Sequence, residues 1–560
     1  MTASAPDGAG ASHFIGVDVG TGSARAGVFD GSGRLLAAAR RDIDLYREAG
    51  DVVEQSSNDI WGAVSACVRE AVGKSGVAAA AIAGIGFDAT CSLVVLGEEG
   101  RPLPVGPHGD EERNIIVWMD HRATDQARRI NMTRHPVLGY VGGAISPEME
   151  TPKLLWLAET MPDTFSRAWQ FMDLTDFLTW RSTGSLARSV CTLTCKWTYL
   201  AHEDRWDETY FRAIGLGALA EELFRRIGTE VVPGGTALGR GLTAAAAADL
   251  GLAAGTPVAA GLIDAHAGGV GTVGARGGPG SVLSRMAYVF GTSACTMSST
   301  RDRTFVPGVW GPYRSAMVPG LWLNEGGQSA AGAAIDHLLQ LHPAARETAG
   351  KAEELGTSLS ALLADEAGRR GGARAVPELV GELHVVPEFL GNRAPFADPD
   401  ARGMIAGLGM ATGVESLLGL YLAGLCGLGY GARQIVEAQS RAGISVDTIV
   451  VSGGAAQSRL VRQLLADATG LTVAASTSDE PVLLGSAMLA SVASGASRDI
   501  DEAMSSMSEL GDTYVPLPET AAWHERRFRA FEMLQSAGRA LRDVAGEGEG
   551  AGAAGSAPGA

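Results

Sequence analysis

The sequence predicts an α/β protein of two domains, each built on a mixed β-sheet flanked by helices. The chain has 560 residues, more than a single hydrophobic core normally supports. A strand, a glycine-rich turn and a second strand occur in "FIGVDVGTGSARAGVFD" near the N-terminus and again in "MAYVFGTSACTMSST" near residue 290. This weak internal duplication indicates two domains of similar plan. We expect them at 13–276 and 285–543, between disordered tails at 1–12 and 544–560.

The first domain is expected to open with three consecutive strands. "HFIGVDVG", "ARAGVFD" and "RLLAAARRDI" are apolar runs separated by glycine turns, so the sheet should begin antiparallel. The stretch "NDIWGAVSACVREAVGKSG" predicts a helix, and "IAGIGFDAT" predicts a buried strand that ends at Asp88. "TPVAAGLIDAHAGGVG" then predicts a strand running into a helix, with Asp264 at the junction.

The second domain continues from its hairpin into a helix-rich region. "DTIVVSGGAAQSRLVRQLLADATGLTV" predicts a strand, a glycine turn and a helix, and "PVLLGSAMLASVASG" predicts a final helix. A G-x-G-x-x-G match at 269–274 is not expected to bind a dinucleotide, because "DAHAG" separates it from its strand and an acidic residue is missing about twenty positions on.

Composition excludes several classes of function. A net charge of −18 without a cluster of basic residues argues against nucleic acid and anionic membrane as partners. The six cysteines lack C-x-x-C spacing, so we expect reduced thiols without disulfide or zinc roles. The first residues do not read as a signal peptide, and the alanine-rich stretches are too short to span a bilayer. The expected location is therefore cytoplasmic.

The glycine turns have the chemistry of a phosphate site. Without a Cβ atom, their backbone N–H groups can approach phosphate oxygens closely, and Thr21, Ser23 and Thr292 add hydroxyl donors. Asp18 and Asp264 are expected at strand ends beside these turns. One carboxylate would hold Mg²⁺, normally through water, and another would orient or deprotonate an acceptor hydroxyl. A single such hairpin would be only a turn, whereas two of them with strand-end aspartates favour nucleotide binding.

Specific motifs extend this interpretation. "GIGFDATCS", "VWMDHRA", "FMDLTDFLTWRSTG", "CKWTY", "GLIDAHAGGVG", "FGTSACTM", "LGNRAPFADP" and "VVSGGAAQS" occur in one order, and with them the chain from Ile15 to about Leu541 resembles the FGGY-family carbohydrate kinases of the ribulokinase-like branch. The stretch "FVPGVWGPYRSAMVPGLWLNEGGQS" is most similar to D-ribulose kinases. The resemblance implies a two-domain actin-like ATPase (ribonuclease H-like) fold, with sugar deep in a central cleft and ATP nearer its mouth.

The resemblance also implies roles for individual residues. Asp264 corresponds to the general base, and Asp18 to the carboxylate on the Mg²⁺ side. The implied nucleotide contacts are Gly20, Thr21, Gly22, Ser23 and Arg25 in the first phosphate loop, Gly291, Thr292 and Ser293 in the second, and Gly332, Asp336, Gly453, Gly454 and Ser458 beyond them. Asp264 and seven further residues would form the sugar pocket: Asp88, Cys91, Trp118, Asp120, His121, Lys196 and Glu325. ATP and Mg²⁺ are the implied cofactors, and a homodimer is the implied assembly because family members are often dimeric.

These roles agree with the chemistry of a ketopentose, which is uncharged and rich in hydroxyls. Its pocket needs carboxylates, a lysine and an aromatic face, and each buried polar partner discriminates against the wrong epimer. Trp118 is equally explained as core, His121 as a bridge to its neighbouring loop, and His266 as an ordinary buried helix histidine. At its reference pKa of about 3.9 Asp264 would be a weak base, which suffices if the transition state is loose.

The expected function is ATP-dependent phosphorylation of a ketopentose, D-ribulose giving D-ribulose 5-phosphate. L-Ribulose, xylulose and ribitol remain open as substrates, since epimers differ by one hydrogen-bond partner. An alternative of another class is an actin-like ATPase switch that does not need sugar, and a further one is a sugar sensor that has lost catalysis. A switch would have no use for Lys196, Glu325 and Trp118 together, and a sensor would not need Asp18 and Asp264.

Overall fold

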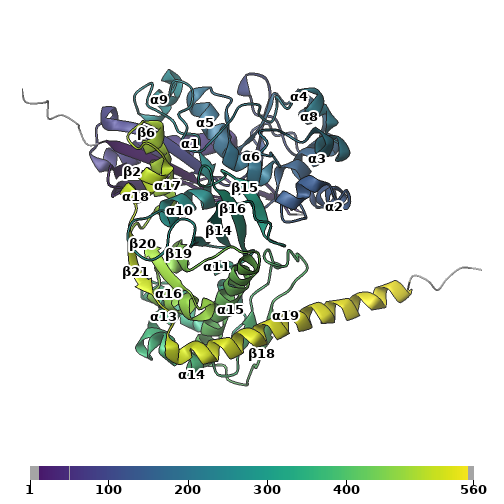
Figure 1. Cartoon of the computed structure of the whole chain (residues 1–560), viewed down its shortest axis with the longest axis vertical. Coiled ribbons are helices and arrows are strands. Elements are labelled where there is room, and N and C mark those ends of the chain that lie inside the picture. Colours follow the sequence, from purple (N-terminus) through teal and green to yellow (C-terminus); the bar gives the residue numbers. More distant parts are fainter. Residues whose placement is uncertain (1–11, 50, 553–560) are drawn as a thin grey trace, which may run out of the picture. The chain divides into compact units, whose positions relative to one another are not determined.

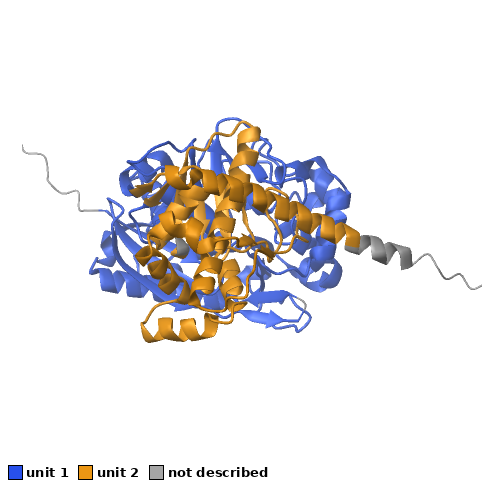
Figure 2. Ribbon diagram, turned by 90° about the horizontal axis from the view of Figure 1, so that it is seen from below, with its two compact units in different colours: residues 1–287, 297–325, 476–511 blue, residues 288–296, 326–475, 512–560 orange. Residues whose placement is uncertain are grey.

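The computed structural model describes residues 12–49 and 51–552 of the chain. The N-terminal tail expected at 1–12 therefore lies, except for Ser12, outside the described residues. The chain divides into two compact units (Figure 2). Unit 1 comprises Met1–Ala287, Met297–Glu325 and Ser476–Gly511, and unit 2 comprises Tyr288–Thr296, Gly326–Ala475 and Asp512–Ala560.

This division interleaves the sequence, whereas we expected one boundary between 276 and 285. The segment Ser476–Gly511 belongs to unit 1 because its helix α17, Pro481–Ala493, packs on strands β1 and β6 and on helix α10. Sequence order alone does not reveal that return of the chain.

Unit 1 is built on a five-stranded sheet in the order β12-β6-β1-β2-β3. Strands β1 (His13–Val19), β2 (Ser23–Asp30) and β3 (Leu35–Asp42) are antiparallel neighbours, which confirms the expected opening. Strand β6 (Ile82–Ala89) runs parallel to β1, and β12 (Leu262–Ile263) runs parallel to β6. The carboxyl ends of β1, β6 and β12 therefore lie at one edge of the sheet.

Residues alternate between the two faces of this sheet. Ile15, Val17, Ile85 and Phe87 enter a core shared with helix α1, Ser57–Ser75. This helix is capped by Ser56, whose hydroxyl accepts from Asp59 N–H.

Helix α17 covers the other face and lies beside β2, β6 and α10 in Figure 1. Glycines permit this close approach. A Cβ at Gly16 would lie 1.9 Å from Leu483 O, one at Gly86 would lie 2.1 Å from Ser486 O, and one at Gly485 would lie 1.9 Å from Ala267 O. Asp18 and Asp88 are on this same glycine-lined face, two residues beyond Gly16 and Gly86.

A second sheet of unit 1 has the order β4-β5-β8-β7-β9. Its strands are Tyr46–Glu48, Val52–Gln55, Ile115–Ile116, Leu93–Leu96 and Gln170–Asp173, and the short strands β10 (Arg188–Ser189) and β11 (Val231–Val232) pair separately. The remaining helices of unit 1 are α2 Thr124–Met132, α3 Glu150–Thr160, α4 Pro162–Arg167, α5 Leu174–Thr183, α6 Val190–Lys196, α7 Glu208–Ala213, α8 Gly217–Glu221, α9 Ala244–Leu250, α10 Asp264–Val273 and α18 Ile500–Met507.

A seven-stranded sheet has the order β15-β16-β14-β13-β19-β20-β21; β15 belongs to unit 1, β19 belongs to unit 2, and the unit boundaries fall within the other five strands. In that order the strands are Trp310–Arg314, Trp322–Gln328, Ala294–Thr300, Arg285–Phe290, Thr448–Ser452, Thr472–Ser476 and Leu510–Tyr514, and β17 (His384–Val386) pairs with β18 (Met404–Ala406). The helices of unit 2 are α11 Gly332–Gln340, α12 Ala345–Glu354, α13 Leu359–Arg369, α14 Val376–Val380, α15 Val414–Arg441, α16 Arg459–Thr469 and α19 Pro518–Gly552.

Two helices of unit 2 bear on the sequence predictions. Helix α15 is long and apolar enough to cross a membrane by length and composition, but most of its apolar stretch is buried and it packs against α11, α14 and α16 as a core helix. Helix α19 continues to Gly552, so 544–552 is helical where we expected a disordered tail (Figure 1). Residues 553–560 lie outside the described residues.

Candidate active site

Three carboxylates of unit 1 gather at the edge where β1, β6 and β12 end. The Cα atoms of Asp18 and Asp88 are register partners in the β1–β6 pairing, and Leu262 of β12 is the partner of Asp88. Asp264 follows β12 as the first residue of α10. Parallel strands thus place three aspartates side by side although they are far apart in sequence.

Asp88 is the most buried of the three. Ser486 Oγ of α17 donates to its Oδ2 at 2.5 Å, and its Oδ1 has no hydrogen-bond partner among the described residues. Burial raises the pKa of Asp88 well above its usual range, and the neighbouring Asp18 carboxylate raises it further. Burial and the neighbouring carboxylate therefore favour the neutral form of Asp88.

Asp18 is ion-paired. Arg25 Nε donates to Asp18 Oδ2 at 2.7 Å, and a second Arg25 nitrogen donates to Glu480 Oε2 at 2.8 Å. Burial lowers the pKa of Arg25, but Asp18 and Glu480 outweigh it and the net shift is upward. Arg25, expected at the nucleotide, therefore lies between two carboxylates of its own unit, and sequence reasoning missed Glu480.

Asp264 differs from the expectation that it keeps an ordinary pKa. Its Oδ1 accepts the N–H of Ala265 at 2.7 Å. Burial and then the Asp18 carboxylate raise the pKa of Asp264 to about 6. The carboxylate is thereby a stronger base than a solvated aspartate while staying ionised at neutral pH.

Lys196 and Glu325 are brought together, as the proposed sugar pocket requires. Their Nζ and Oε1 atoms are 3.8 Å apart, and Lys196 Nζ lies 4.5 Å from the centroid of the Trp310 ring. Both side chains are buried. Burial lowers the pKa of Lys196, but the nearby Glu325 carboxylate raises it more, so the net shift is upward. The buried lysine therefore keeps its charge and can donate hydrogen bonds beside Glu325.

His266 and two cysteines lie against this pair. His266 Nε2 is 3.3 Å from Glu325 Oε2, and its Nδ1 is 3.0 Å from Cys191 Sγ. Ligand atoms of Cys191, Cys195 and His266 all lie within 4.8 Å of one another, a set that would suit a soft metal ion. Among these three, Cys191 and His266 contact each other directly.

Cys91 is buried, and burial raises the pKa of its thiol. Sequence reasoning missed Glu150 and Lys153 on α3, which are fully buried with Oε1 and Nζ 3.5 Å apart. Burial, opposed by Lys153, raises the pKa of Glu150 to about 7. The E-x-x-K spacing in this apolar helix is the sequence signal that could have predicted the buried ion pair.

Trp118 joins the first glycine turn. Its Nε1 donates to Thr21 Oγ1 at 3.0 Å, while Gln55 Nε2 donates to Thr21 O at 2.8 Å. Gly20 N–H donates to Ser23 O at 3.0 Å and closes the turn. A Cβ at Gly22 would meet no described atom within 4 Å, so the turn has open space beside it.

Asp120 and His121 differ from the other expected sugar contacts. Asp120 Oδ2 accepts from Val53 N–H at 2.6 Å, and both its oxygens accept from Arg122 Nε at 2.9 Å. Arg122 also donates to Glu54 Oε1 at 2.8 Å. Asp120 is thus fully engaged in a buried structural ion pair, and His121 is exposed with Nε2 3.7 Å from Glu148 Oε1.

In unit 2 the second glycine turn is held by the start of α11. Gly332 N–H donates to Gly291 O at 3.0 Å, and Ala331 N–H donates to Thr292 O at 2.8 Å. Ser293 completes the turn, since its carbonyl accepts from Gly291 N–H at 3.0 Å. Gly453 has φ 93°, and a Cβ there would lie 2.4 Å from Phe290 O, so only glycine fits beneath the end of β13.

A cavity of about 960 Å³ lies in unit 2. Four of the expected nucleotide residues line it: Gly332, Asp336, Gly454 and Ser458. Further walls come from α13 and α15, including Asp365 and Tyr421. Its volume is in the range of sites for drug-sized ligands and cofactors.

Comparison with known proteins agrees with this architecture. The N-terminal domain of the FGGY family of carbohydrate kinases matches residues 13–271, and the C-terminal domain matches 286–494. The chain belongs to the FGGY family of carbohydrate kinases.

Relatives of this kinase extend over nearly its whole length. A human FGGY carbohydrate kinase domain-containing protein is 46% identical over 532 residues, covering 93% of this chain and 96% of its own. A D-ribulokinase of Saccharomyces cerevisiae is 38% identical over 518 residues, covering 86% of this chain and 72% of its own.

Solved structures share the two-domain kinase fold. A xylulose kinase from Rhodospirillum rubrum has a TM-score of 0.76 at 22% identity and covers 94% of this chain and 99% of its own. A glycerol kinase from Plasmodium falciparum has a TM-score of 0.74 at 15% identity and covers 94% and 98%. The expected fold class is thereby confirmed.

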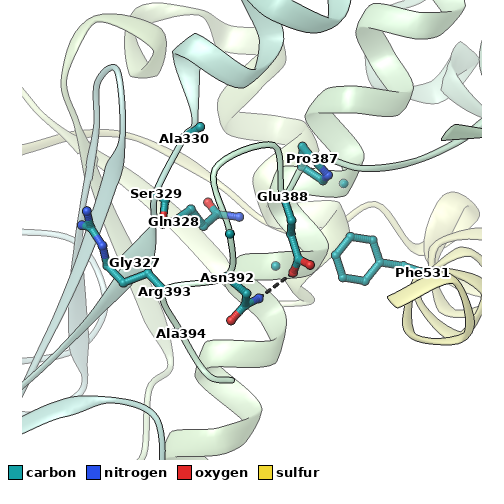
Figure 3. Close-up of a pocket in the computed structure, with 13 residues that line it drawn as sticks. Gly327, Gln328, Ser329, Ala330, Pro387, Glu388, Asn392, Arg393, Ala394 and Phe531 are labelled. Atoms are coloured by element: carbon teal, nitrogen blue, oxygen red, sulfur yellow. Dashed lines mark hydrogen bonds between the residues drawn. The ribbon is translucent and has the colours of Figure 1, made fainter. Parts of the chain in front are cut away.

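A second pocket of the kinase, also in unit 2, is shown in Figure 3. Its volume of about 20 Å³ fits about one water molecule. Asn392 Nδ2 and Gln535 Nε2 donate to Glu388 Oε1 at 2.5 and 2.6 Å, so its polar groups bond one another. It is too small for a nucleotide.

Proposed function

We propose that this FGGY kinase transfers the γ-phosphoryl group of ATP to the terminal hydroxyl of D-ribulose and forms D-ribulose 5-phosphate. Asp264 acts as the general base. The observation that carries the proposal is the position of Asp264, a carboxylate whose pKa is raised to about 6, at the strand edge of Asp18 and Asp88. The similarity to a D-ribulokinase supports the choice of sugar.

In this proposal unit 1 recognises the sugar. Lys196 donates to sugar oxygens, while Glu325 and Asp88 exchange hydrogen bonds with its hydroxyls. Cys91 forms part of the wall, and Trp310, already beside Lys196, offers an aromatic face to the C–H surface. Because the Lys196–Glu325 pair is buried, a sugar with one hydroxyl inverted would leave a charged group without a partner.

Unit 2 binds the nucleotide. Its 960 Å³ cavity holds the adenosine portion between Asp336 on α11 and Ser458 before α16. The turn at 291–293 in unit 2, and separately the turn at 20–23 in unit 1, each offer backbone N–H groups of the kind that bind phosphate oxygens. The attacking hydroxyl gives its proton to an Asp264 carboxylate oxygen as the new O–P bond forms.

Mg²⁺ is the proposed companion of ATP. Carboxylate oxygens are the ligands that this cation takes, and Asp88 Oδ1, beside Asp18, has no hydrogen-bond partner among the described residues, which supports a cation at this edge. Asp18 would hold the ion, usually through water, and the ion would neutralise charge on the transferred phosphoryl group.

A substrate panel tests the proposal. D-Ribulose, L-ribulose, D-xylulose, L-xylulose and ribitol are supplied with ATP and Mg²⁺, and ADP release is measured by a coupled assay. We expect the highest kcat/KM for D-ribulose. A higher kcat/KM for another sugar would replace D-ribulose as the proposed substrate. ADP release at the same rate with and without every sugar would favour an ATPase switch.

Thermal unfolding with sugar alone separates the kinase from the switch. A ligand that binds only the folded state raises Tm. D-Ribulose at millimolar concentration should therefore raise Tm without nucleotide, whereas a switch without a sugar pocket would not respond. The proposed location is the cytoplasm, where thiols stay reduced. Light scattering tests the proposed homodimer.

A further inference from the structure

We propose that His266 and Cys191 are positioning residues that fix the Glu325 carboxylate for sugar recognition. The inference rests on the proposed function, because it takes Glu325 as a sugar-binding group. It assigns a role to a histidine that sequence reasoning explained as an ordinary core residue.

The four side chains form one continuous chain of polar contacts inside unit 1. Cys191 Sγ is 3.0 Å from His266 Nδ1, and His266 Nε2 is 3.3 Å from Glu325 Oε2. Glu325 Oε1 is 3.8 Å from Lys196 Nζ. Each oxygen of Glu325 thus faces a different cation, one on α10 and one at the end of α6.

Burial makes these contacts consequential. Cys191 and His266 are 0% exposed, and Glu325 is 4% exposed. A carboxylate removed from water requires hydrogen-bonding or charged partners to remain ionised. If Lys196 Nζ turns toward a sugar oxygen, His266 remains as the partner that keeps Glu325 ionised and oriented.

The two ring nitrogens of His266 face different groups. Nδ1 lies against Cys191 Sγ, and Nε2 is turned toward Glu325 Oε2 at charge-contact distance without an aligned hydrogen bond. Since Nε2 faces Glu325, the geometry favours a positioning role for the ring. Cys191 Sγ also accepts the N–H of Ile263 at 3.5 Å, the residue before Asp264. The network therefore ties the Glu325 contact to the strand end that carries the general base.

Electrostatics agrees with this geometry. Burial lowers the pKa of His266, but Cys191 and Glu325 outweigh it and the net shift is upward. Burial raises the pKa of the Cys191 thiol, but contacts with Cys195 and His266 outweigh it and the net shift is downward. Both shifts favour the charged forms of the pair, a thiolate on Cys191 and an imidazolium on His266.

Two substitutions at His266 separate positioning from simple packing. His266→Gln can keep an N–H donor near the position of Nε2, whereas His266→Asn can reach only the Cys191 side. We expect His266→Asn to raise KM for D-ribulose about tenfold or more, the effect of losing a hydrogen bond to a charged group. KM for ATP should stay within about twofold, and His266→Gln should restore KM for D-ribulose to within about threefold of wild type.

Cysteine variants give an independent measurement that holds even if His266→Asn does not fold. Cys191→Ala removes the Nδ1 partner and should raise KM for D-ribulose severalfold with KM for ATP unchanged. Cys67→Ala is the matched control. Cys67 lies on α1, is also buried, and its Sγ donates to Ala24 O at 3.3 Å. Cys67→Ala should leave both constants unchanged at a comparable Tm.

The outcomes are distinguishable from failure of the proposed function. If wild type phosphorylates D-ribulose and His266→Asn or Cys191→Ala keeps its wild-type KM for D-ribulose, the positioning role is wrong and the function stands. Equal losses in His266→Asn and His266→Gln, for sugar and ATP alike, would also overturn it in favour of packing. If wild type acts on no sugar of the panel, the function fails and this inference fails with it.

Discussion

Asp18 and Asp88 face each other as register partners on the parallel strands β1 and β6, on the face of the sheet that glycines open to helix α17. Asp18 is paired with Arg25, while Asp88 accepts from Ser486 and has a raised pKa. Two like residues at one edge therefore have different partners, and Asp264 completes the set with a pKa raised to about 6.

The raised pKa of Asp88 predicts a pH-dependent gain in stability for Asp88→Asn. A carboxyl whose folded-state pKa is raised binds its proton more tightly when folded, so wild-type stability falls as pH rises from the unfolded value near 3.8 toward the raised folded value. Asparagine resembles the neutral carboxyl and removes this loss. The Tm of Asp88→Asn minus that of wild type should therefore increase with pH above about 4, measured by thermal unfolding without ligand.

Asp18→Asn is the contrasting variant for that experiment. It removes the carboxylate that bonds Arg25 and leaves Arg25 with Glu480 alone. Its Tm should fall below wild type at neutral pH. Equal pH dependence of Asp88→Asn and wild type would show that Asp88 is ionised in the folded protein.

Asp264→Asn should lower kcat by roughly 10²–10⁴-fold, because the amide cannot accept the hydroxyl proton. The fold should be retained, since an amide oxygen can still accept the N–H of Ala265. Steady-state kinetics and thermal unfolding check this. Asp249→Asn is the control, because Asp249 accepts from Trp61 Nε1 on α1 and should change kcat by less than about twofold.

The acid limb of the pH profile should report Asp264. The general base must be ionised, so kcat/KM should fall tenfold per pH unit below the pKa of about 6. An aspartate in water would place this limb near 3.9. A kcat/KM profile flat down to pH 5 would remove Asp264 from the base role, because kcat/KM reports the free enzyme. A shift of this pKa by bound sugar would appear in the limb of kcat instead.

Gly16→Ala should destabilise the protein severely. The added Cβ would lie 1.9 Å from Leu483 O, so helix α17 must move off the sheet. We expect a loss of about 3 kcal/mol or more in the free energy of unfolding. Gly62 is an exposed position of α1, where a Cβ would meet no described atom within 4 Å. Gly62→Ala should instead raise the free energy of unfolding by about 0.5–1 kcal/mol. Chemical denaturation measures both, and similar values would contradict close packing at Gly16.

Much of the fold was predictable because its signals are local. The hairpin at 13–30, helix α1 and strand β6 follow from runs of apolar residues and turns, and the structure has them within a residue or two. Asp264 at a strand-to-helix junction was predictable for the same reason. The G-x-G-x-x-G match at 269–274 was correctly set aside, since Gly269–Val273 lies inside helix α10.

Partners distant in sequence were not predictable. Glu480 reaches Arg25, and Ser486 reaches Asp88, only because α17 returns to the first sheet. Asp120 belongs to a predicted sugar-pocket motif, yet its carboxylate is bound by Arg122. The sequence by itself determined which residue types stand at strand ends and turns, because backbone preference and hydrophobic period act over a few residues. Only the tertiary structure decided the partners of each carboxylate and the direction in which its pKa shifts. Burial and neighbouring charges set both, and the folded chain brings those neighbours from hundreds of residues away.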